Sequence, residues 1–219
     1  MNPYRQWIFR RLLDWASGKM DKERAELIAM AQGEVLELGS GTGANFPFYS
    51  DQLVRLWALE PETPVMALAE QTRLGLPAVQ SEKINLLCAD GHHLPFADDS
   101  LDSVICCLVL CTVPYPDKMM REVRRVLKPG GRLCLTGFLV EPGMVLTDAV
   151  LPLSPYREGA WVADSREPER AIGYERAVFE DWVRQAGLRL AEPVEPGHWS
   201  TPQRTGEFQD RIVLERLPL

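Results

Sequence analysis

Long apolar stretches, an excess of positive charge and a cysteine framework are all missing from this chain of 219 residues. The longest uninterrupted apolar run, residues 104–111, has the length of a strand and falls far short of the ~18 residues that a membrane-spanning helix needs. The 24 Lys and Arg residues are outnumbered by 31 Asp and Glu residues, so no overall positive field attracts nucleic acid. We therefore expect no transmembrane segment, no nucleic-acid partner, and a small-molecule or amphipathic ligand.

Cysteine and histidine are also scarce, with five and three residues. The cysteines lack the spacing of a disulfide framework, because four lie inside apolar, strand-like runs and Cys111 ends one. On an extended strand, Cys106 and Cys107 would point to opposite faces, and Cys107 and Cys111 would lie about 13 Å apart at roughly 3.3 Å per residue. A metal ion needs its sulfur ligands much closer. The sequence thus predicts packing cysteines, no metal site and a reducing, cytoplasmic environment.

The hydrophobic pattern predicts an α/β fold, because short apolar runs alternate with segments of helical spacing. Strands that are apolar on both faces are typical of a parallel sheet covered by helices on each side. The expected strands are 34–38, 54–59, 84–89, 103–111, 132–138, 188–194 and 208–214, and the expected helices include 63–73, 117–127 and 174–186. We expect Thr63 and Asp117 to cap the first two of these helices. The last two strands form an antiparallel hairpin in this prediction.

We predict a single domain over residues 1–219 with two additions to the sheet. Residues 1–32 have apolar residues at helical intervals and are expected to form a helical cap over the site. Residues 140–173 contain Pro142, Pro152, Pro155 and Pro168, which exclude long regular elements. We expect this segment to be an insertion, or lid, over the carboxyl edge of the sheet.

A glycine-rich turn follows the first expected strand, in the segment Glu37-Leu38-Gly39-Ser40-Gly41-Thr42-Gly43-Ala44-Asn45. Glycines at alternate positions let the backbone turn sharply and let a ligand approach main-chain atoms. Ligands of open parallel sheets bind at this edge. From Gly39 the segment also fits the dinucleotide fingerprint G-x-G-x-x-A, and Glu60 stands about where a ribose-binding acid belongs. A nicotinamide-dependent oxidoreductase is therefore an alternative interpretation of this turn.

Three features favour S-adenosyl-L-methionine over a dinucleotide. The Glu37 carboxylate beside the turn would repel a diphosphate and attract the amino group of a methionine moiety. Pro47 interrupts the long helix whose amino end would hold a pyrophosphate. Asp90 follows the third strand and is suited to accept a hydrogen bond from an adenine amine.

Together with this turn, other short strings resemble a known family. They are Val35 to Gly43, Glu60-Pro61, Asp90 with Leu94-Pro95-Phe96, Asp102-Ser103-Val104, and Leu127-Lys128-Pro129-Gly130-Gly131. In order and spacing they resemble the class I S-adenosylmethionine-dependent methyltransferases of the small-molecule type, over roughly residues 33–138. The resemblance implies a seven-stranded, Rossmann-like sheet of order 3-2-1-4-5-7-6 with strand 7 antiparallel, and S-adenosyl-L-methionine as cofactor.

The resemblance also implies roles for individual residues. The glycine turn and Glu37 would lie at the methionine end, Glu60 at the ribose, Pro61 and Asp90 beside the adenine, and Leu108 near the cofactor. Glu60 stands where Asp is more usual, and its longer side chain should still reach the ribose. The implied cofactor-binding residues are Glu37, Gly39, Ser40, Gly41, Thr42, Gly43, Asn45, Glu60, Pro61, Asp90, Gly91, His92 and Leu108. As a loop residue, His92 is expected to be exposed to solvent together with His93.

A narrower likeness concerns the acceptor. Residues 43–49 and 108–113 resemble the methyltransferase-like enzymes of endoplasmic reticulum and lipid droplets that methylate alkyl thiols, and this likeness ends after Phe138. A thiol acceptor is therefore one hypothesis beside oxygen and nitrogen acceptors.

Four residues are candidates for the acceptor side: Cys111, Tyr115, His198 and Trp199. His198 could act as a general base because the ordinary pKa of histidine is near neutrality. No catalytic residue is obligatory, since the sulfonium already activates the methyl group and aligned binding supplies much of the rate. We expect methyl transfer to a small or amphipathic acceptor. A non-catalytic subunit that only binds S-adenosylmethionine is the remaining alternative.

Overall fold

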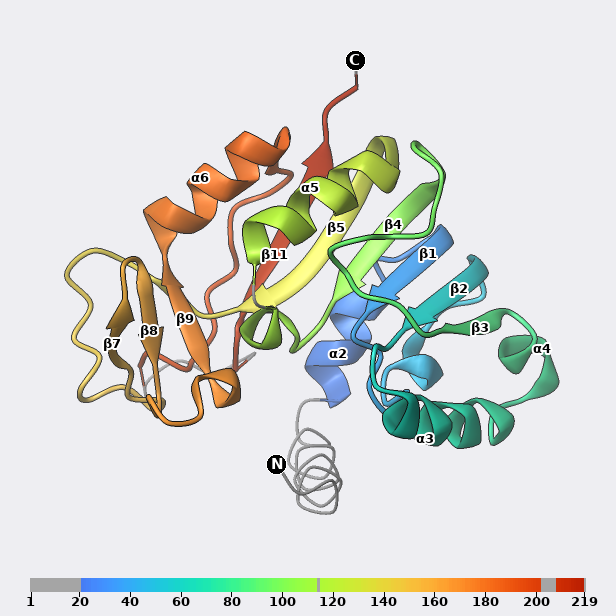
Figure 1. Cartoon of the computed structure of the whole chain (residues 1–219), viewed down its shortest axis with the longest axis horizontal. Coiled ribbons are helices and arrows are strands. Elements are labelled where there is room, and N and C mark those ends of the chain that lie inside the picture. Colours follow the sequence, from blue (N-terminus) through green and yellow to red (C-terminus); the bar gives the residue numbers. More distant parts are fainter. Residues whose placement is uncertain (1–20, 114, 202–207, 219) are drawn as a thin grey trace.

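The computed structural model describes residues 21–113, 115–201 and 208–218 (Figure 1). Of the expected helical cap over residues 1–32, only helix α2 (Asp21–Ile28) lies among these residues. In the described part of the chain, no helix has both the length and the apolar character to cross a membrane.

A seven-stranded sheet forms the centre of the molecule, in the order β10-β11-β5-β4-β1-β2-β3. Its strands are β1 (Gly33–Leu38), β2 (Leu53–Leu59), β3 (Ile84–Leu87), β4 (Leu101–Cys106), β5 (Leu127–Gly137), β10 (Leu188–Leu190) and β11 (Asp210–Arg216). Strands β1 to β5 pair in parallel, whereas β11 runs antiparallel to both β5 and β10. Numbered within this sheet alone, the order is 3-2-1-4-5-7-6, so the predicted α/β fold and strand order are confirmed.

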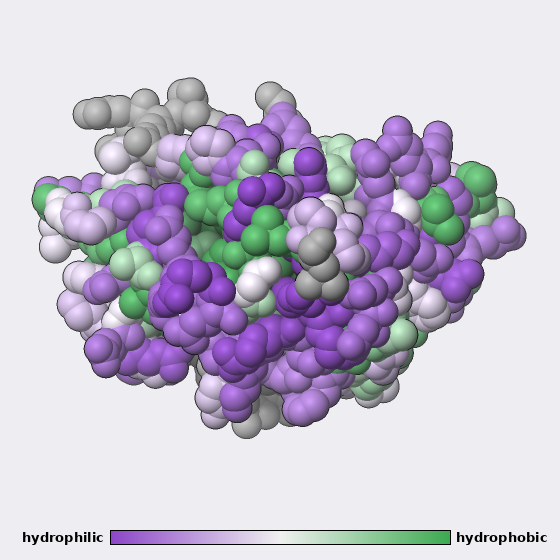
Figure 2. Space-filling model, turned by 90° about the horizontal axis from the view of Figure 1, so that it is seen from above, coloured by the Kyte–Doolittle hydropathy of each residue, from purple (hydrophilic) through white to green (hydrophobic). Residues whose placement is uncertain are grey.

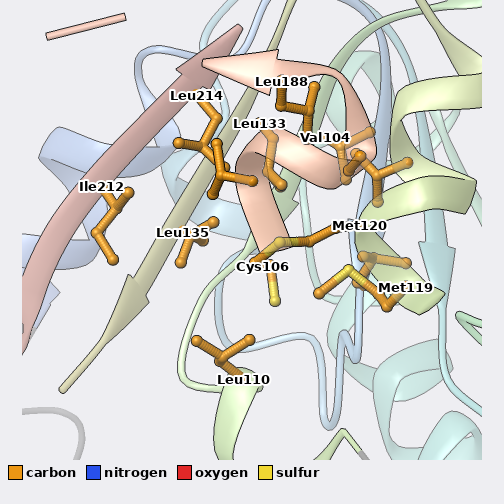
Figure 3. Packing of buried hydrophobic residues seen from close by; sticks show 14 of the residues in the cluster. Val104, Cys106, Leu110, Met119, Met120, Leu133, Leu135, Leu188, Ile212 and Leu214 are labelled. Carbon is orange, nitrogen blue, oxygen red and sulfur yellow. The ribbon is translucent and has the colours of Figure 1, made fainter. Parts of the chain in front are cut away.

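Successive residues of each strand point to opposite faces of the sheet, and both faces are buried. One face packs against α5 (Pro116–Val126) and α6 (Arg176–Ala186). Figure 3 shows this face, where the labelled residues are Val104, Cys106, Leu110, Met119, Met120, Leu133, Leu135, Leu188, Ile212 and Leu214. The intervening residues Val35, Ile105, Cys134 and Val213 pack on the other face, against α2 and α3 (Thr63–Leu74). This double burial explains the continuous apolar runs of the sequence.

Cysteine side chains contribute to both faces. Cys106, Cys107 and Cys134 are buried, as the packing interpretation predicts. Cys88 is exposed, because β3 ends one residue before it, so the prediction of a packing cysteine is wrong there. Burial raises the pKa of the Cys134 thiol to about 11, so this group stays protonated and apolar. Among the described residues no cluster of His, Cys, Asp or Glu is suited to hold a metal ion.

The predicted strand 103–111 is wrong in its second half. Strand β4 ends at Cys106, the chain turns at 107–109, and the 3-10 helix η3 (Leu110–Thr112) follows. Leu108 has φ +60°, a left-handed backbone that a strand cannot contain, and its N–H donates to Thr136 Oγ1 at 2.9 Å. The separation of Cys107 and Cys111 expected along a strand therefore does not apply.

Helix starts and strand ends also differ from the prediction. Glu62 and Tyr115, rather than Thr63 and Asp117, occupy the N-cap positions of α3 and α5. Helix α6 begins two residues later than expected because the preceding residues belong to strand β9. Strands β3 and β10 end earlier than predicted, and β11 is shifted two residues toward the carboxyl end.

The proline-containing segment forms a small second sheet, in the order β6-β9-β8-β7. Its strands are β6 (Leu139–Val140), β7 (Ser154–Arg157), β8 (Ala160–Val162) and β9 (Ile172–Glu175), none longer than four residues. Pro155 lies in the exposed edge strand β7, where a missing N–H is tolerated. In Figure 1 this sheet lies to the side of the central sheet, where β5 leads into it. Its own core includes Phe138, Leu153 and Trp199.

One buried carboxylate joins the two sheets. Asp210, the first residue of β11, accepts hydrogen bonds from the backbone N–H of Leu139 at 2.7 Å and of Gly197 at 2.8 Å. The Trp199 indole N–H donates to the same carboxylate at 3.0 and 3.1 Å. Burial raises the pKa of Asp210, and these donors partly oppose that effect. The carboxylate therefore fixes the start of β11 against the small sheet.

The surface seen from above is mostly hydrophilic (Figure 2). A group of hydrophobic residues lies in a central hollow of that face.

Candidate active site

The glycine turn after β1 has a backbone that only glycine adopts without strain. Gly39, Gly41 and Gly43 have φ angles of +63°, +56° and +80°. A Cβ atom at Gly39 would lie 2.7 Å from Val109, and one at Gly43 would lie 2.5 Å from Phe46. At Gly41 the nearest atom would be the Gly39 carbonyl oxygen at 4.0 Å. Two glycines thus allow close packing, and the middle one leaves its backbone open to a ligand.

Glu37 lies beneath this turn with 1% of its surface exposed. Its carboxylate accepts hydrogen bonds from Asn45 Nδ2 at 2.7 Å and from the Tyr49 hydroxyl at 3.0 Å. Burial raises the pKa of Glu37 to about 7, although both donors and the positive charge of Arg24 act to lower it. Glu37 is therefore an acid whose charge is sensitive to pH near neutrality.

Glu60 follows β2 and is buried. Its Oε2 accepts a hydrogen bond from the Gly41 N–H at 3.1 Å, and its Oε1 accepts one from the Glu62 N–H at 3.0 Å. The carboxylate thus lies directly against the open glycine. Pro61, the next residue, is exposed at the same edge of the sheet.

Asp90 follows β3 and is bound to His92. Its Oδ1 accepts a hydrogen bond from the His92 N–H at 2.9 Å and lies 2.6 Å from the His92 ring Nδ1. These hydrogen bonds lower the pKa of Asp90. An ionised carboxylate has no hydrogen to donate, so Nδ1 carries the shared proton. The His92 side chain is only 12% exposed, which corrects the expectation of a solvent-exposed residue.

Tyr115 lies beside His92, on this side of the site. Its ring meets the His92 ring edge to face at 5.8 Å, and Lys118 Nζ lies 4.4 Å from the centre of the Tyr115 ring. Gly91 lies close to the core, because a Cβ atom added there would be 3.7 Å from Leu38 Cδ2.

Three polar atoms around the glycine turn are buried and have no hydrogen-bond partner among the described residues. They are Ser40 Oγ, Asn45 Oδ1 and His92 Nε2. Buried polar groups in folded proteins are normally paired with protein or with water, so these three atoms are available to water or to a polar ligand. The Thr42 carbonyl, in contrast, is held by the Thr72 hydroxyl at 2.7 Å.

A small pocket adjoins the turn at the carboxyl ends of β4 and β5. Its lining comes from three parts of the central sheet and one strand of the small sheet. Leu108 and Cys111 follow β4, Thr136 and Phe138 lie at the end of β5, and Gln209 directly precedes β11. Ile172 belongs to β9 of the small sheet. The lining side chains leave no free space between them large enough for a water molecule, in contrast to the ~300–1,000 Å³ of typical ligand sites. Any acceptor that binds here must therefore move a lining side chain aside.

The other two acceptor candidates lie outside this pocket lining. Trp199 is 1% exposed, packs edge to face on Phe138 at 5.4 Å, and binds Asp210. His198 packs its ring against Phe208 at 5.2 Å. The structure brings Leu108 and Cys111 together at the pocket and places Trp199 in the core of the small sheet.

Sequence reasoning missed Tyr49, Thr136 and Gln209. Tyr49 lies in the string that carries the thiol-enzyme likeness, but no local signal connects its hydroxyl to Glu37. Thr136 and Gln209 become visible only once β5 and β11 are paired, because the register places Asp210 opposite Gly137.

Comparison with protein families and relatives gives a consistent result. The methyltransferase domain family matches residues 36–135. A demethylmenaquinone methyltransferase of Thermobifida fusca is 30% identical over 168 residues, which cover 76% of this chain and 68% of the relative. A thiol S-methyltransferase of Homo sapiens is 34% identical over 148 residues, which cover 64% of this chain and 59% of the relative. The chain spans 39% to 59% of the length of the human and rodent thiol S-methyltransferases that it matches.

Solved structures share the fold. A SAM-dependent methyltransferase from Methanosarcina mazei superposes with a TM-score of 0.63 at 21% identity, over 85% of this chain and 93% of that one. A SAM-dependent methyltransferase from Aquifex aeolicus gives a TM-score of 0.59 at 16% identity, over 89% and 88%. At these identities the likeness concerns the arrangement of the elements.

Proposed function

The chain belongs to the family of S-adenosylmethionine-dependent methyltransferases, and on this basis we propose that it transfers the methyl group of S-adenosylmethionine to a thiol. The observation that carries the proposal is the placement of Glu37, Glu60 and Asp90 at the ends of three neighbouring strands around an open glycine. The thiol is suggested by the human relative and by the chemistry of the pocket lining.

The residues present fit the cofactor. Gly41 has room for a ligand against its backbone, and Ser40, Asn45 and His92 each keep a buried polar atom available for one. In this proposal Glu37 and the turn hold the methionine end, Glu60 the ribose hydroxyls, and Asp90 the adenine amine. The same carboxylates disfavour the diphosphate of a nicotinamide cofactor. The turn also leads into a 3-10 helix of three residues, Phe46–Phe48, and not into a long helix that would bind a pyrophosphate.

S-adenosylmethionine supplies an electrophilic methyl group, which leaves its sulfonium as the bond to the acceptor forms. The chain contributes alignment and exclusion of water, because the pocket beside the turn is lined mainly by apolar side chains. Cys111 is the one ionisable side chain in the described lining, so the lining offers no efficient proton acceptor. A thiol, with a pKa of about 8.5, loses its proton to water far more readily than an alcohol does. This difference favours sulfur as the accepting atom.

We propose that the small sheet forms one wall of the acceptor pocket. Ile172 of β9 reaches the pocket, and the wall is fixed to the central sheet through Asp210. The described chain is then one domain in which residues 140–173 cover the acceptor side.

The first test is cofactor binding and turnover. Calorimetric titration should show binding of S-adenosylmethionine and none of NADH, and S-adenosylmethionine should be consumed when simple thiols are added. Phenols, amines and phospholipid vesicles complete the acceptor panel. Tight NADH binding without an S-adenosylmethionine signal would identify an oxidoreductase, and binding without consumption by any acceptor would identify a non-catalytic subunit.

A second prediction concerns His92. Because its ring holds the Asp90 carboxylate, His92→Ala should weaken S-adenosylmethionine binding about 2- to 10-fold, the effect of losing one hydrogen bond. The dissociation constant from calorimetry measures this change. His93→Ala is the matched control, since His93 is exposed and adjacent. Equal affinities of the His92 variant and the wild type would remove His92 from the site.

A further inference from the structure

We propose that Gln209 positions the acceptor, and that the preferred acceptor is a thiol carrying a hydrogen-bond donor beside its sulfur. Gln209 is 8% exposed and lines the pocket, and its Oε1 is buried with no hydrogen-bond partner among the described residues. This inference rests on the proposed methyl transfer to a thiol.

The other polar side chains of the lining have internal partners. Thr136 Oγ1 accepts a hydrogen bond from the Leu108 N–H at 2.9 Å, and Cys111 Sγ lies 3.9 Å from the Leu108 carbonyl oxygen. The Gln209 oxygen is thus the polar atom of the lining that is left for a ligand. A buried amide oxygen without a partner costs free energy, which a donor on the acceptor would recover.

The backbone of Gln209 is held firmly on both sides. The next residue, Asp210, binds two backbone N–H groups and one indole N–H through its carboxylate. A Cβ atom at Gly197 would lie 2.5 Å from the Gln209 carbonyl carbon, so this glycine allows a second segment to pack directly on the Gln209 backbone. A side chain on so constrained a backbone is suited to fix the orientation of a bound molecule.

The amide oxygen cannot remove a proton, and its role is to orient. The thiol proton passes to solvent, the acceptor sulfur forms its bond to the methyl carbon, and the electrons of the broken bond remain on the cofactor sulfur. A hydroxyl two carbons from the acceptor sulfur would donate to Gln209 Oε1 and leave the sulfur free to react. The two faces of such a molecule match a lining of apolar residues with one amide oxygen.

The test compares two thiols of equal size, 2-mercaptoethanol and 1-propanethiol, in the wild type and in Gln209→Met. Methionine keeps the length of the side chain and removes the amide. The wild type should prefer 2-mercaptoethanol in kcat/KM, and the variant should reduce that preference about 3- to 10-fold, as expected for one neutral hydrogen bond. The dissociation constant of S-adenosylmethionine should stay within about twofold of the wild-type value, because Gln209 makes no contact with the glycine turn in this proposal.

Two further variants keep the test decisive. Gln209→Glu retains an acceptor oxygen and should retain the preference, so it also serves if the methionine variant fails to fold. Gln185→Met, on the exposed side of α6, should leave kcat/KM unchanged for both thiols. An unchanged preference in Gln209→Met, or equal rates with both thiols in the wild type, overturns the role of Gln209 while leaving methyl transfer intact. Failure to methylate either thiol would instead overturn the proposed function.

Discussion

Replacing Glu60 by alanine is expected to lower the affinity for S-adenosylmethionine about 100- to 1,000-fold. A ribose offers two hydroxyl donors to this carboxylate, and hydrogen bonds to a charged group contribute about 1.5–2 kcal/mol each at the lower end of their range, which gives this change in affinity. Glu60 is buried at the end of β2 and already accepts the Gly41 N–H at 3.1 Å. Its removal therefore affects both the ribose contact and the shape of the glycine turn.

These two contributions are separable. Glu60→Gln keeps one acceptor oxygen for the turn and should lose about 10-fold in affinity, less than the alanine variant. Glu82→Ala is the control, because Glu82 is an exposed acid in the same half of the chain. Calorimetry gives the dissociation constants, and thermal unfolding verifies that each variant is folded. Wild-type affinity in Glu60→Ala would refute the assigned cofactor site.

Replacing Glu37 by glutamine should stabilise the protein without cofactor at pH 8 while weakening cofactor binding. The pKa of Glu37 is raised from 4.5 to about 7 in the folded protein. A raised carboxyl pKa means that the folded state holds a proton that the unfolded state has lost. The associated stability is complete below pH 4.5 and is lost as the pH rises to about 7, a change of about 3 kcal/mol.

The glutamine side chain has no charge to bury, and Tyr49 and Asn45 can still bond to it. We expect the free energy of unfolding of the wild type to fall between about pH 5 and 7 and that of Glu37→Gln to fall less. Urea unfolding at several pH values measures both. Parallel pH profiles for the two proteins would show that Glu37 titrates normally.

Cofactor affinity should rise with pH, in contrast to the stability of the cofactor-free protein, which falls. The cationic amino group of S-adenosylmethionine favours the ionised form of Glu37, so binding near pH 6 should release a proton. The wild-type dissociation constant should then fall with rising pH from about 5 to 7, by at most about tenfold per pH unit. In Glu37→Gln this dependence should be absent and the affinity lower. Titrations in buffers of different ionisation enthalpy detect the released proton directly.

The central sheet could be predicted from the sequence because its strands are apolar on both faces and its turns carry glycine and proline. The turn after Cys106 could not be predicted, because Leu108 takes a left-handed backbone conformation in the middle of an apolar run that continues to Cys111. Nothing local distinguishes that leucine from its neighbours. Its conformation depends on Thr136, 28 residues away.

The candidate site divides in the same way. Glu37, Glu60 and Asp90 are recognisable because they lie at or just beyond the ends of strands, and the edge of a parallel sheet brings such positions together. The longer-range contacts are not recognisable: Tyr49 bonds to Glu37 from the segment after the 3-10 helix, and Asp210, which fixes β11 against the small sheet, bonds to Leu139 across 71 residues. The position of Gln209 at the pocket could not be predicted, because it depends on the pairing of β11 with β5.

The bond between Asp210 and Leu139 has a consequence for how new specificities could arise in this architecture. The residues that hold the nucleoside in the proposed function all lie before residue 109, whereas Ile172 of the acceptor lining comes from a separate, short-stranded module inserted after β5. Exchanging that module would leave the nucleoside grip untouched, provided that the incoming segment offers a main-chain donor where Leu139 now does. The Asp210 carboxylate would thus be the common point at which different inserted segments attach to the central sheet.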